Sequence, residues 1–427
     1  MLTWSVSLAV CSVIRGVRAL AAPTVVSPLA ASRHTWTPQS AVIIGKRDSS
    51  SLPEKPRAQD AAPRFAFAFD IDGVLLHVSK PIPGATESLR YLQKHHIPFI
   101  LLTNGGGKRE ADRVADLSQK LGVPLSTSNF VQSHTPFRQL VSDNNDPNNL
   151  ANKTVLATGS DYAKSRAVLH SYGFQNVITP ADIIAANPTI FPFRHLTELS
   201  SDTRPLPKPI HTGTGSLSSS LKIDAVFVLD DPRDWAVDIQ IISDLLLSHA
   251  GYLGTLSPQN GNCTLPSCGW QTDGQPTLFF SNGDLEWSAN FHLPRFGQGA
   301  FQAALAGTWR RYTGGHELKR TVIGKPEEET YRFAERVLGE HRHEDLRRLG
   351  LHEAGVLDRV YMVGDNPESD IVGANRFRSE VGTEWVSVLV KTGVWREGRK
   401  FGEGREPRVI VEDVRRGVGW ALEREGW

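Results

Sequence analysis

The chain has 427 residues, of which 40% are hydrophobic and 22% are charged. A chain of this length can build two or three domains with hydrophobic cores, so disorder throughout is excluded. The 47 Lys and Arg residues nearly cancel the 46 Asp and Glu residues, and a net charge of +1 provides no general attraction to nucleic acid or to an anionic membrane. Nucleic acid is therefore not an expected partner, and any phosphate must be bound locally.

Residues 1–60 have the composition of an organelle transit peptide followed by a linker. No acidic residue precedes Asp48, whereas Arg15, Arg18 and Arg33 lie among Ser, Thr, Ala and Leu, which is typical of mitochondrial targeting. A secretory signal is the alternative, but its basic residues would precede the apolar stretch, and here Arg15 and Arg18 follow it. Because these arginines interrupt the run short of the roughly 20 apolar residues that span a bilayer, we expect a mitochondrial matrix protein without an integral membrane segment.

From residue 61 onward, short apolar runs alternate with stretches that suit helices, which is the pattern of an α/β protein. Four runs are apolar at every position, as parallel strands are when helices cover both faces of a sheet. They are residues 65–69, 97–102, 360–363 and 386–390. We predict a doubly wound parallel sheet. Polar residues or glycines follow the first three runs, so one crevice at the carboxyl ends of the strands is expected to collect them.

A smaller α/β unit is predicted as an insert over residues 137–291. Its strand candidates are residues 154–158, 225–229 and 277–281. Residues 187–222 and 251–276, which are rich in Pro, Gly, Ser and Asn, predict long surface loops, with disorder as the alternative. Residues 61–136 and 292–427 then form the two parts of the larger domain, with hinges near Pro136 and between residues 291 and 298.

Cys263 and Cys268 lie in the second of these loops, and Cys11 is the third cysteine of the chain. A zinc site would need a further pair of Cys or His ligands at a suitable spacing. We therefore expect a plain loop, no disulfide framework and a reducing compartment.

The motif Asp70-Ile71-Asp72-Gly73 directly follows the first predicted strand. A carboxylate at the end of a buried strand can act as a nucleophile, and a second one two residues later can donate or accept a proton. The alternatives are an Asp-rich turn without chemistry and part of a calcium loop, which is disfavoured because Val74 stands where a third ligand is needed. Asp70 and Asp72 are therefore candidate catalytic residues.

Two further motifs suit phosphate binding. Thr103-Asn104-Gly105 follows the second strand, and a hydroxyl followed by unhindered backbone amides can hold phosphoryl oxygens, although glycine-rich loops are also plain connectors. Lys325 lies between an apolar stretch and a helix that begins with Pro326. Most lysines are solvated surface charges, but this position favours a role beside a phosphate or carboxylate.

Asp365 and Asp370 follow the strand at residues 360–363. Carboxylates of this kind suit Mg²⁺, which takes few protein ligands and completes its octahedron with waters and substrate phosphate. A capped helix turn is the alternative interpretation.

Taken together, these four motifs resemble the signatures of the haloacid dehalogenase (HAD) superfamily of aspartate-dependent phosphatases. The signatures are D-x-D-G, a strand-ending Thr, a Lys and G-D-x4-D, and they occur here in that order. The long insert resembles the class IIA cap of that superfamily, so the resemblance implies a HAD-like Rossmannoid core with a smaller α/β cap. More narrowly, three segments resemble the mitochondrial cat eye syndrome critical region protein family: Asp230 to Trp235, Phe280 to Asp284 and Val322 to Pro326.

The resemblance also implies roles for the motif residues. Asp70 would attack phosphorus and form an aspartyl-phosphate, while Asp72 would act as general acid and then as general base. The phosphoryl group would be held by Thr103 with the amides of Asn104 and Gly105, and Lys325 would offset its charge. Magnesium would be bound by Asp70, the backbone carbonyl of Asp72 and Asp365, with Asp370 in the outer shell.

The predicted function is Mg²⁺-dependent hydrolysis of a small phosphate monoester. Asp284 and Trp287 resemble a substrate-facing turn at the end of the cap and are candidate substrate contacts, with a structural turn as the alternative. Phosphoryl transfer to another acceptor, glycerophospholipid-related phosphate metabolism and a binding protein that retains the HAD fold are the alternatives. The expected partner is a small phosphorylated metabolite, and the sequence does not indicate an oligomeric state.

Overall fold

The computed structural model describes residues 42–43, 52, 63–143, 145–193, 202–287, 289, 291, 293–350, 355–398 and 400–427. Apart from the strand β1 (Val42–Ile43) and Leu52, the expected transit peptide and linker lie outside the described residues.

The larger unit is built on a seven-stranded sheet in which every pairing is parallel. Its strands, in spatial order, are β1, β16 (Val409–Val411), β15 (Glu384–Val390), β14 (Arg359–Gly364), β2 (Phe65–Phe69), β5 (Phe99–Thr103) and β6 (Phe130–Gln132). All four apolar runs singled out in the sequence are strands of this sheet. The chain crosses from β2 outward in both directions, so the predicted doubly wound sheet is confirmed.

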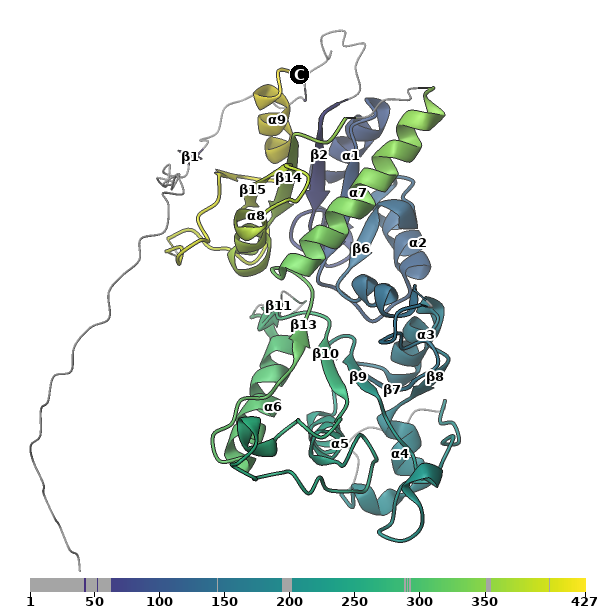
Figure 1. Ribbon diagram of the computed structural model, residues 1–427. Coiled ribbons are helices and arrows are strands. Elements are labelled where there is room, and N and C mark those ends of the chain that lie inside the picture. Colours follow the sequence, from purple (N-terminus) through teal and green to yellow (C-terminus); the bar gives the residue numbers. More distant parts are fainter. Residues whose placement is uncertain are drawn as a thin grey trace, which may run out of the picture. The chain divides into compact units, whose positions relative to one another are not determined.

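Both faces of this sheet are covered by helices (Figure 1). One face packs against α1 (Ala85–Lys94), α2 (Glu110–Leu121) and α9 (Val414–Arg424), and the other against α7 (Glu328–Arg348) and α8 (Val372–Arg376). The side chains of β2 alternate between the two faces of the sheet: Phe67 packs with the first group of helices and Ala68 with the second. The alanines of β2 pack in one cluster with Tyr331, Phe333 and Ala334 of α7.

The smaller unit has a five-stranded sheet that is also entirely parallel. Its order is β13 (Thr321–Val322), β10 (Thr277–Phe280), β9 (Ala225–Val228), β7 (Thr154–Thr158) and β8 (Asn176–Ile178). Its helices are α3 (Tyr162–Tyr172) on one face and α4 (Pro180–Ala186), α5 (Trp235–Leu247) and α6 (Gln298–Tyr312) on the other. The expected α/β insert is therefore present.

The insert ends later than the sequence suggested. The expected boundary at residue 291 is wrong, because α6 packs into the hydrophobic cluster of the second sheet through Phe301, Leu305 and Trp309. In addition, β13 pairs with β10. The chain thus returns to the larger unit at Lys325, and not between residues 291 and 298, whereas the outward crossing does lie beside Pro136, in the 3₁₀ helix Thr135–Val141.

The two long loops lie outside the regular structure but are packed against the second sheet. Leu221 and Leu253 are buried in its hydrophobic cluster, and the Leu253 amide donates to the Leu221 carbonyl (3.2 Å). Residues 194–201, in the first loop, lie outside the described residues. The expectation of a plain loop around the cysteines is wrong: Cys263 and Cys268 form a disulfide, because the turn between them, with Ser267 in the left-handed region, brings the two side chains together.

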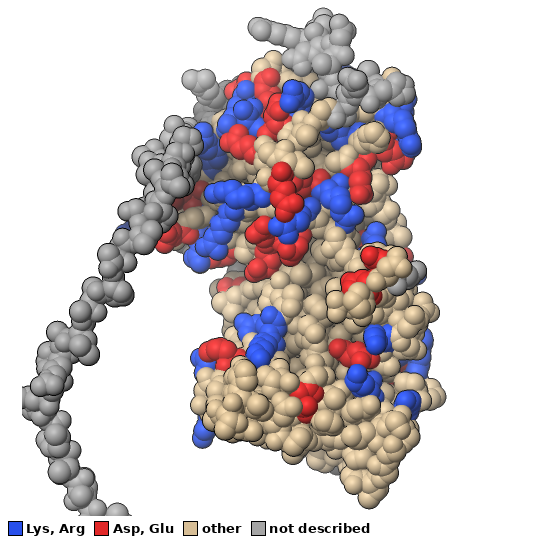
Figure 2. Space-filling model, viewed as in Figure 1, with Lys and Arg blue, Asp and Glu red and all other residues tan. Residues whose placement is uncertain are grey.

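Two short hairpins complete the fold. One is β3 (Leu76–His77) with β4 (Lys80–Pro81), and the other is β11 (Glu286–Trp287) with β12 (Arg295–Phe296). On the face shown in Figure 2, Lys and Arg alternate with Asp and Glu over the larger unit, whereas the smaller unit carries few charges. Among the described helices, none is long and apolar enough to cross a membrane.

A buried carboxylate of the smaller unit makes its stability depend on pH. Asp238 on α5 is fully buried, and burial raises its pKa to about 7, although hydrogen bonds from Thr158 Oγ1 (2.6 Å) and Tyr162 Oη (3.2 Å) oppose the shift. Between about pH 4 and 7 the unfolded chain therefore binds fewer protons than the folded one, and the free energy of unfolding falls as pH rises.

We expect Asp238→Asn to stabilise the protein by about 1 kcal/mol or more at pH 8 and by much less at pH 4.5, because the amide carries no charge to bury. Urea unfolding of both proteins at the two pH values measures this difference. An equal difference at both pH values would contradict the prediction.

Candidate active site

The C-terminal edge of the larger sheet brings three motifs together. β2 lies between β14 and β5, so Asp70, Asp365 and Thr103 leave adjacent parallel strands at the same edge. The Asp70 amide donates to the Val363 carbonyl (2.9 Å), which continues the ladder and fixes the start of the turn. Gly73 then turns with φ 92°, where a Cβ atom would lie 2.6 Å from Asp365 Oδ2.

Lys325 reaches this edge from the end of the second sheet. Its side chain is 2% exposed, and its Nζ donates to Asp70 Oδ1 and Asp370 Oδ1, both at 2.6 Å. Burial disfavours the charged amine, but the carboxylates of Asp370 and Asp70 outweigh burial and raise the pKa of Lys325 above its ordinary value. Lys325 is therefore a fixed positive charge between two acids.

Asn104 joins the two units at the base of the site. Its Oδ1 accepts from the Lys325 amide (2.7 Å), and its Nδ2 donates to the Lys325 carbonyl (2.8 Å) and to Asp284 Oδ2 (2.9 Å). The side chain of Asn104 thus positions Lys325 and Asp284. The neighbouring Gly105 amide donates to Thr103 Oγ1 (2.9 Å), so the Thr103 hydroxyl and this loop form one local turn.

Asp70, Asp365 and Asp370 form a cluster of buried carboxylates whose oxygens lie within 4.8 Å of one another. Burial raises the pKa of Asp70 to about 7, against the lowering effect of Lys325. Burial, with Asp70 and Asp370 nearby, raises the pKa of Asp365 well above its ordinary value. One lysine therefore does not compensate this group of acids, and a hard divalent cation fits the all-oxygen donor set.

Asp72 lies apart from this cluster. Its carboxylate is half exposed in the pocket, and its Oδ2 lies 3.6 Å from Arg113 Nη2. Loss of water raises its pKa, with Arg113 as the largest opposing influence. The position suits proton transfer to a group bound above Asp70, while the expected metal contact through the Asp72 backbone carbonyl stays a prediction.

A pocket of about 590 Å³ opens above these residues. All ten site residues predicted from the sequence line it: Asp70, Asp72, Thr103, Asn104, Gly105, Asp284, Trp287, Lys325, Asp365 and Asp370. Burial raises the pKa of Asp284 to about 6, although its hydrogen bond from Asn104 opposes the shift.

Other residues of the site were not predicted. Arg113, one turn into α2, faces Asp72, and the Val394 amide donates to Asp365 Oδ2 (2.6 Å). Gly393 leaves room for that carboxylate, because a Cβ atom there would collide with Asp365. Gly393 and Val394 could have been predicted from their position, because they follow the strand β15 at the same edge of the sheet as the other site residues.

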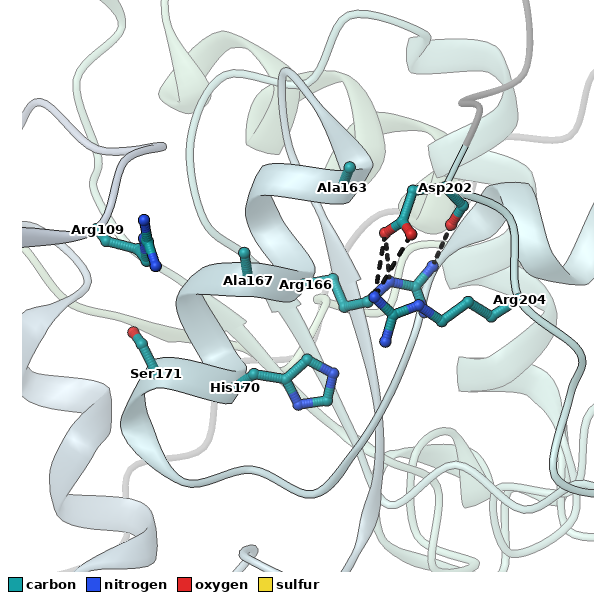
Figure 3. Close-up of a pocket in the computed structure, with 8 residues that line it drawn as sticks. All are labelled: Arg109, Ala163, Arg166, Ala167, His170, Ser171, Asp202 and Arg204. Atoms are coloured by element: carbon teal, nitrogen blue, oxygen red, sulfur yellow. Dashed lines mark hydrogen bonds and ion pairs between the residues drawn. The ribbon is translucent and has the colours of Figure 1, made fainter. Parts of the chain in front are cut away.

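A second pocket, of about 410 Å³, lies elsewhere and is lined by α3 (Figure 3). Three of its lining residues are arginines, of which Arg166 and Arg204 both face Asp202. Arg166 is also paired with the buried Asp182 (2.9 Å). These ion pairs neutralise Arg166 and Arg204 locally and account for the burial of Arg166, which is 2% exposed, so we assign this pocket no ligand.

Comparison with known proteins agrees with the fold. The family model for haloacid dehalogenase-like hydrolases matches residues 67–175, and a HAD-hydrolase-like model matches residues 322–416. A mitochondrial hydrolase of Saccharomyces cerevisiae is 38% identical over 381 residues, which cover 86% of this chain and 97% of that protein. The chain therefore belongs to the haloacid dehalogenase-like hydrolases and is an enzyme. The narrower class IIA and cat eye syndrome branch assignments stay predictions.

A second relative is a cardiolipin synthase (CMP-forming)/mitochondrial hydrolase fusion protein of Schizosaccharomyces pombe. It is 36% identical over 367 residues, or 84% of this chain and 53% of the fusion protein. Among solved structures, a hypothetical protein from Pyrococcus horikoshii OT3 has a TM-score of 0.49 at 19% identity, covering 84% of this chain and 99% of that one. A glycerol phosphate phosphatase from Mycobacterium tuberculosis, crystallised with calcium, has a TM-score of 0.47 at 17% identity, covering 83% and 74%.

Proposed function

We propose that the enzyme hydrolyses a small phosphate monoester through an aspartyl-phosphate on Asp70. The observation that carries this proposal is the buried Asp70 carboxylate at the floor of the pocket, held by Lys325 Nζ at 2.6 Å. A carboxylate fixed in this way can attack phosphorus without rearrangement, and Lys325 offsets charge on the transferring group.

The other residues then divide the remaining tasks. Asp72 protonates the leaving oxygen and afterwards takes a proton from the hydrolytic water, since it faces the pocket and has a raised pKa. The Thr103 hydroxyl and the Asn104 amide bind phosphoryl oxygens, and the Gly105 amide would exchange its hydrogen bond to Thr103 Oγ1 for one to a phosphoryl oxygen. Asn104 holds Lys325 and Asp284 in place, so it acts as a positioning residue through its side chain.

We further propose Mg²⁺ as the cofactor, held by Asp70 and Asp365 with Asp370 behind them. When bound, the ion would supply the positive charge that the three carboxylates lack and would stabilise charge on the phosphoryl group. Asp370 Oδ2 already accepts from the amides of Asp365 (3.1 Å) and Asn366 (3.0 Å), which orients the loop that carries Asp365.

Removal of one ligand tests this site without reference to activity. At 100 times its dissociation constant, Mg²⁺ is expected to stabilise the wild type by about 2.7 kcal/mol, and Asp365→Asn is expected to lose most of this gain. Thermal unfolding with and without Mg²⁺ measures the effect. Asp358→Asn, at an exposed carboxylate paired with Arg64, is the control and should respond like the wild type. An undiminished response in Asp365→Asn would contradict the proposal.

The function is tested by a screen of the purified chain against a panel of phosphate monoesters, with phosphate release as the readout and Asp70→Asn as the blank. Absence of release above the blank for every ester would overturn the proposal. Product analysis in the presence of an alcohol acceptor separates hydrolysis from phosphoryl transfer. The two reactions differ in whether water is excluded from the site while Asp70 carries phosphate.

A lipid-related phosphate is the second candidate substrate class. The observation that favours it is the Schizosaccharomyces pombe relative, in which the hydrolase is joined to a cardiolipin synthase. Inclusion of glycerol phosphate esters with and without acyl chains in the panel distinguishes the two classes.

We also propose a mitochondrial location, in the matrix, on the acid-free and Arg-bearing first 47 residues and on the names of both relatives. A fluorescent fusion of residues 1–60 is expected to enter mitochondria and to be cleaved between about residues 20 and 60. A fusion of residues 61–427 is the control and should stay outside. Secretion or glycosylation of the first fusion would contradict the assignment.

A further inference from the structure

Exposed apolar side chains form a wall beside the catalytic pocket, and part of this wall lines the pocket. Among the described residues, twelve large hydrophobic side chains are exposed, and five of them belong to the β11–β12 hairpin and its flanks. These five are Leu285, Trp287, Phe291, Leu293 and Phe296, which are between 39% and 65% exposed. Exposed hydrophobic residues that cluster in this way mark a binding surface more often than singly exposed ones do.

This wall is continuous with the catalytic floor. Trp287, Ala289 and Phe291 line the same pocket as Asp70, and the exposed Val78 of the β3–β4 turn lines it from the larger unit. The apolar side chains therefore face the pocket from both units, and a group that extends outward from a phosphate above Asp70 passes between them.

Hydrogen bonds fix the base of the hairpin beside the pocket. The Gly297 amide donates to the Leu285 carbonyl (2.9 Å) and the Gly299 amide to the Asp284 carbonyl (2.8 Å). Asp284 is in turn bonded to Asn104 (2.9 Å). These contacts tie the base of the hairpin, next to Trp287, to the phosphate-binding loop.

Arginines lie beside the apolar wall, among acidic residues that line the same pocket, such as Asp230, Asp231 and Glu286. Arg295 lies over the Phe291 ring, with Cζ 4.6 Å from the ring centroid, and Arg113, Arg233 and Arg295 all line the pocket. A phosphate monoester with an apolar extension matches this wall, since the aromatic rings take the extension out of water.

We propose that the preferred substrates are phosphate monoesters with an apolar leaving group, such as a single alkyl chain, which packs against Trp287 and Phe291 while the phosphate lies above Asp70. This inference rests on the proposed function and names its substrate class. The occupant is the monomeric ester, because Trp287 and Phe291 line the pocket that contains Asp70 and are not part of a detached surface.

The test compares ethyl phosphate with octyl phosphate, kept below the concentration at which it forms micelles. Each methylene fully removed from water contributes up to roughly fourfold, and an open wall gives less. We therefore expect octyl phosphate to bind at least about tenfold more tightly to Asp70→Asn by calorimetry, and the wild type to show a similar ratio in kcat/KM. The double variant Trp287→Ala/Phe291→Ala should reduce this ratio to below about threefold.

Tyr312→Ala is the matched control, because this exposed aromatic residue ends α6 and is not among the pocket residues; it should keep the wild-type ratio. Equal binding of the two esters to Asp70→Asn would overturn the proposal, as would an unchanged ratio in the double variant. If alkyl length has no effect and the protein instead floats with phosphatidylglycerol vesicles, to which it binds through Trp287 and Phe291, the wall is a membrane contact and the proposal is wrong. A tenfold preference in binding without turnover of any ester would support the apolar site and overturn the phosphatase function alone.

Discussion

Asp70→Asn is expected to lower phosphate release by more than about a thousandfold, to the level of the buffer blank, because an amide oxygen is too weak a nucleophile to form the phospho-enzyme. The variant should stay folded. Lys325 keeps Asp370 as a partner at 2.6 Å, and asparagine has nearly the same shape as aspartate. Phosphate release at saturating Mg²⁺ and thermal unfolding measure the two effects separately.

Asp72→Asn is the matched comparison, since it changes the other carboxylate of the same motif. Asp72 faces Arg113 in the half-exposed part of the pocket and takes no part in holding Lys325. Its loss should slow turnover but still allow Asp70 to accept phosphate from acetyl phosphate. Intact-mass measurement should show one added phosphoryl group in this variant and none in Asp70→Asn; equal turnover of Asp70→Asn and the wild type would refute the mechanism.

The strands were the most predictable part of the fold. Residues 65–69 and 154–158 were expected as strands and are β2 and β7 with the same bounds. A parallel strand covered on both faces must be apolar at successive positions, and this signal is contained in a few adjacent residues. It needs no knowledge of which strands pair.

The end of the inserted unit was not predictable in the same way. Phe301, Leu305 and Trp309 give α6 an apolar face, but this periodicity does not say which sheet the helix covers. β13 is only two residues long, and its position next to Lys325 suggested the larger unit. Its pairing with β10 depends on residues some forty positions away.

The site was partly predictable for a geometric reason. Polar residues that directly follow parallel strands lie at one edge of the sheet, so Asp70, Thr103 and Asp365 could be placed together. Contacts between the two units could not be predicted in this way. The hydrogen bonds of Asn104 to Asp284 and Lys325 join positions 180 and 221 residues apart, and no local pattern encodes them.

Lys325 is the positively charged residue within the carboxylate cluster, and its removal leaves the buried acids without that charge. Lys325→Met is expected to abolish phosphate release and to destabilise the protein by about 3–5 kcal/mol at pH 8, because it leaves Asp70 and Asp370 buried without their shared partner. Loss of the lysine, whose charge lowers the pKa of Asp70, moves that pKa in the folded state further above the unfolded value. The free energy of unfolding therefore falls as pH rises, and the deficit should be much smaller at pH 5.

Urea unfolding of the wild type and Lys325→Met at pH 5 and pH 8 in chelator measures this dependence. Lys120→Met is the control: Lys120 also bonds a carboxylate at 2.8 Å, in Asp116, but both side chains are about a quarter exposed, and water screens the pair. The control should lose no more than about 1 kcal/mol at either pH. Added Mg²⁺ should restore part of the stability of Lys325→Met, since the ion supplies the charge that the carboxylates lack. A deficit that is equal at both pH values, or no larger than that of Lys120→Met, would show that Lys325 does not balance the charges of this site.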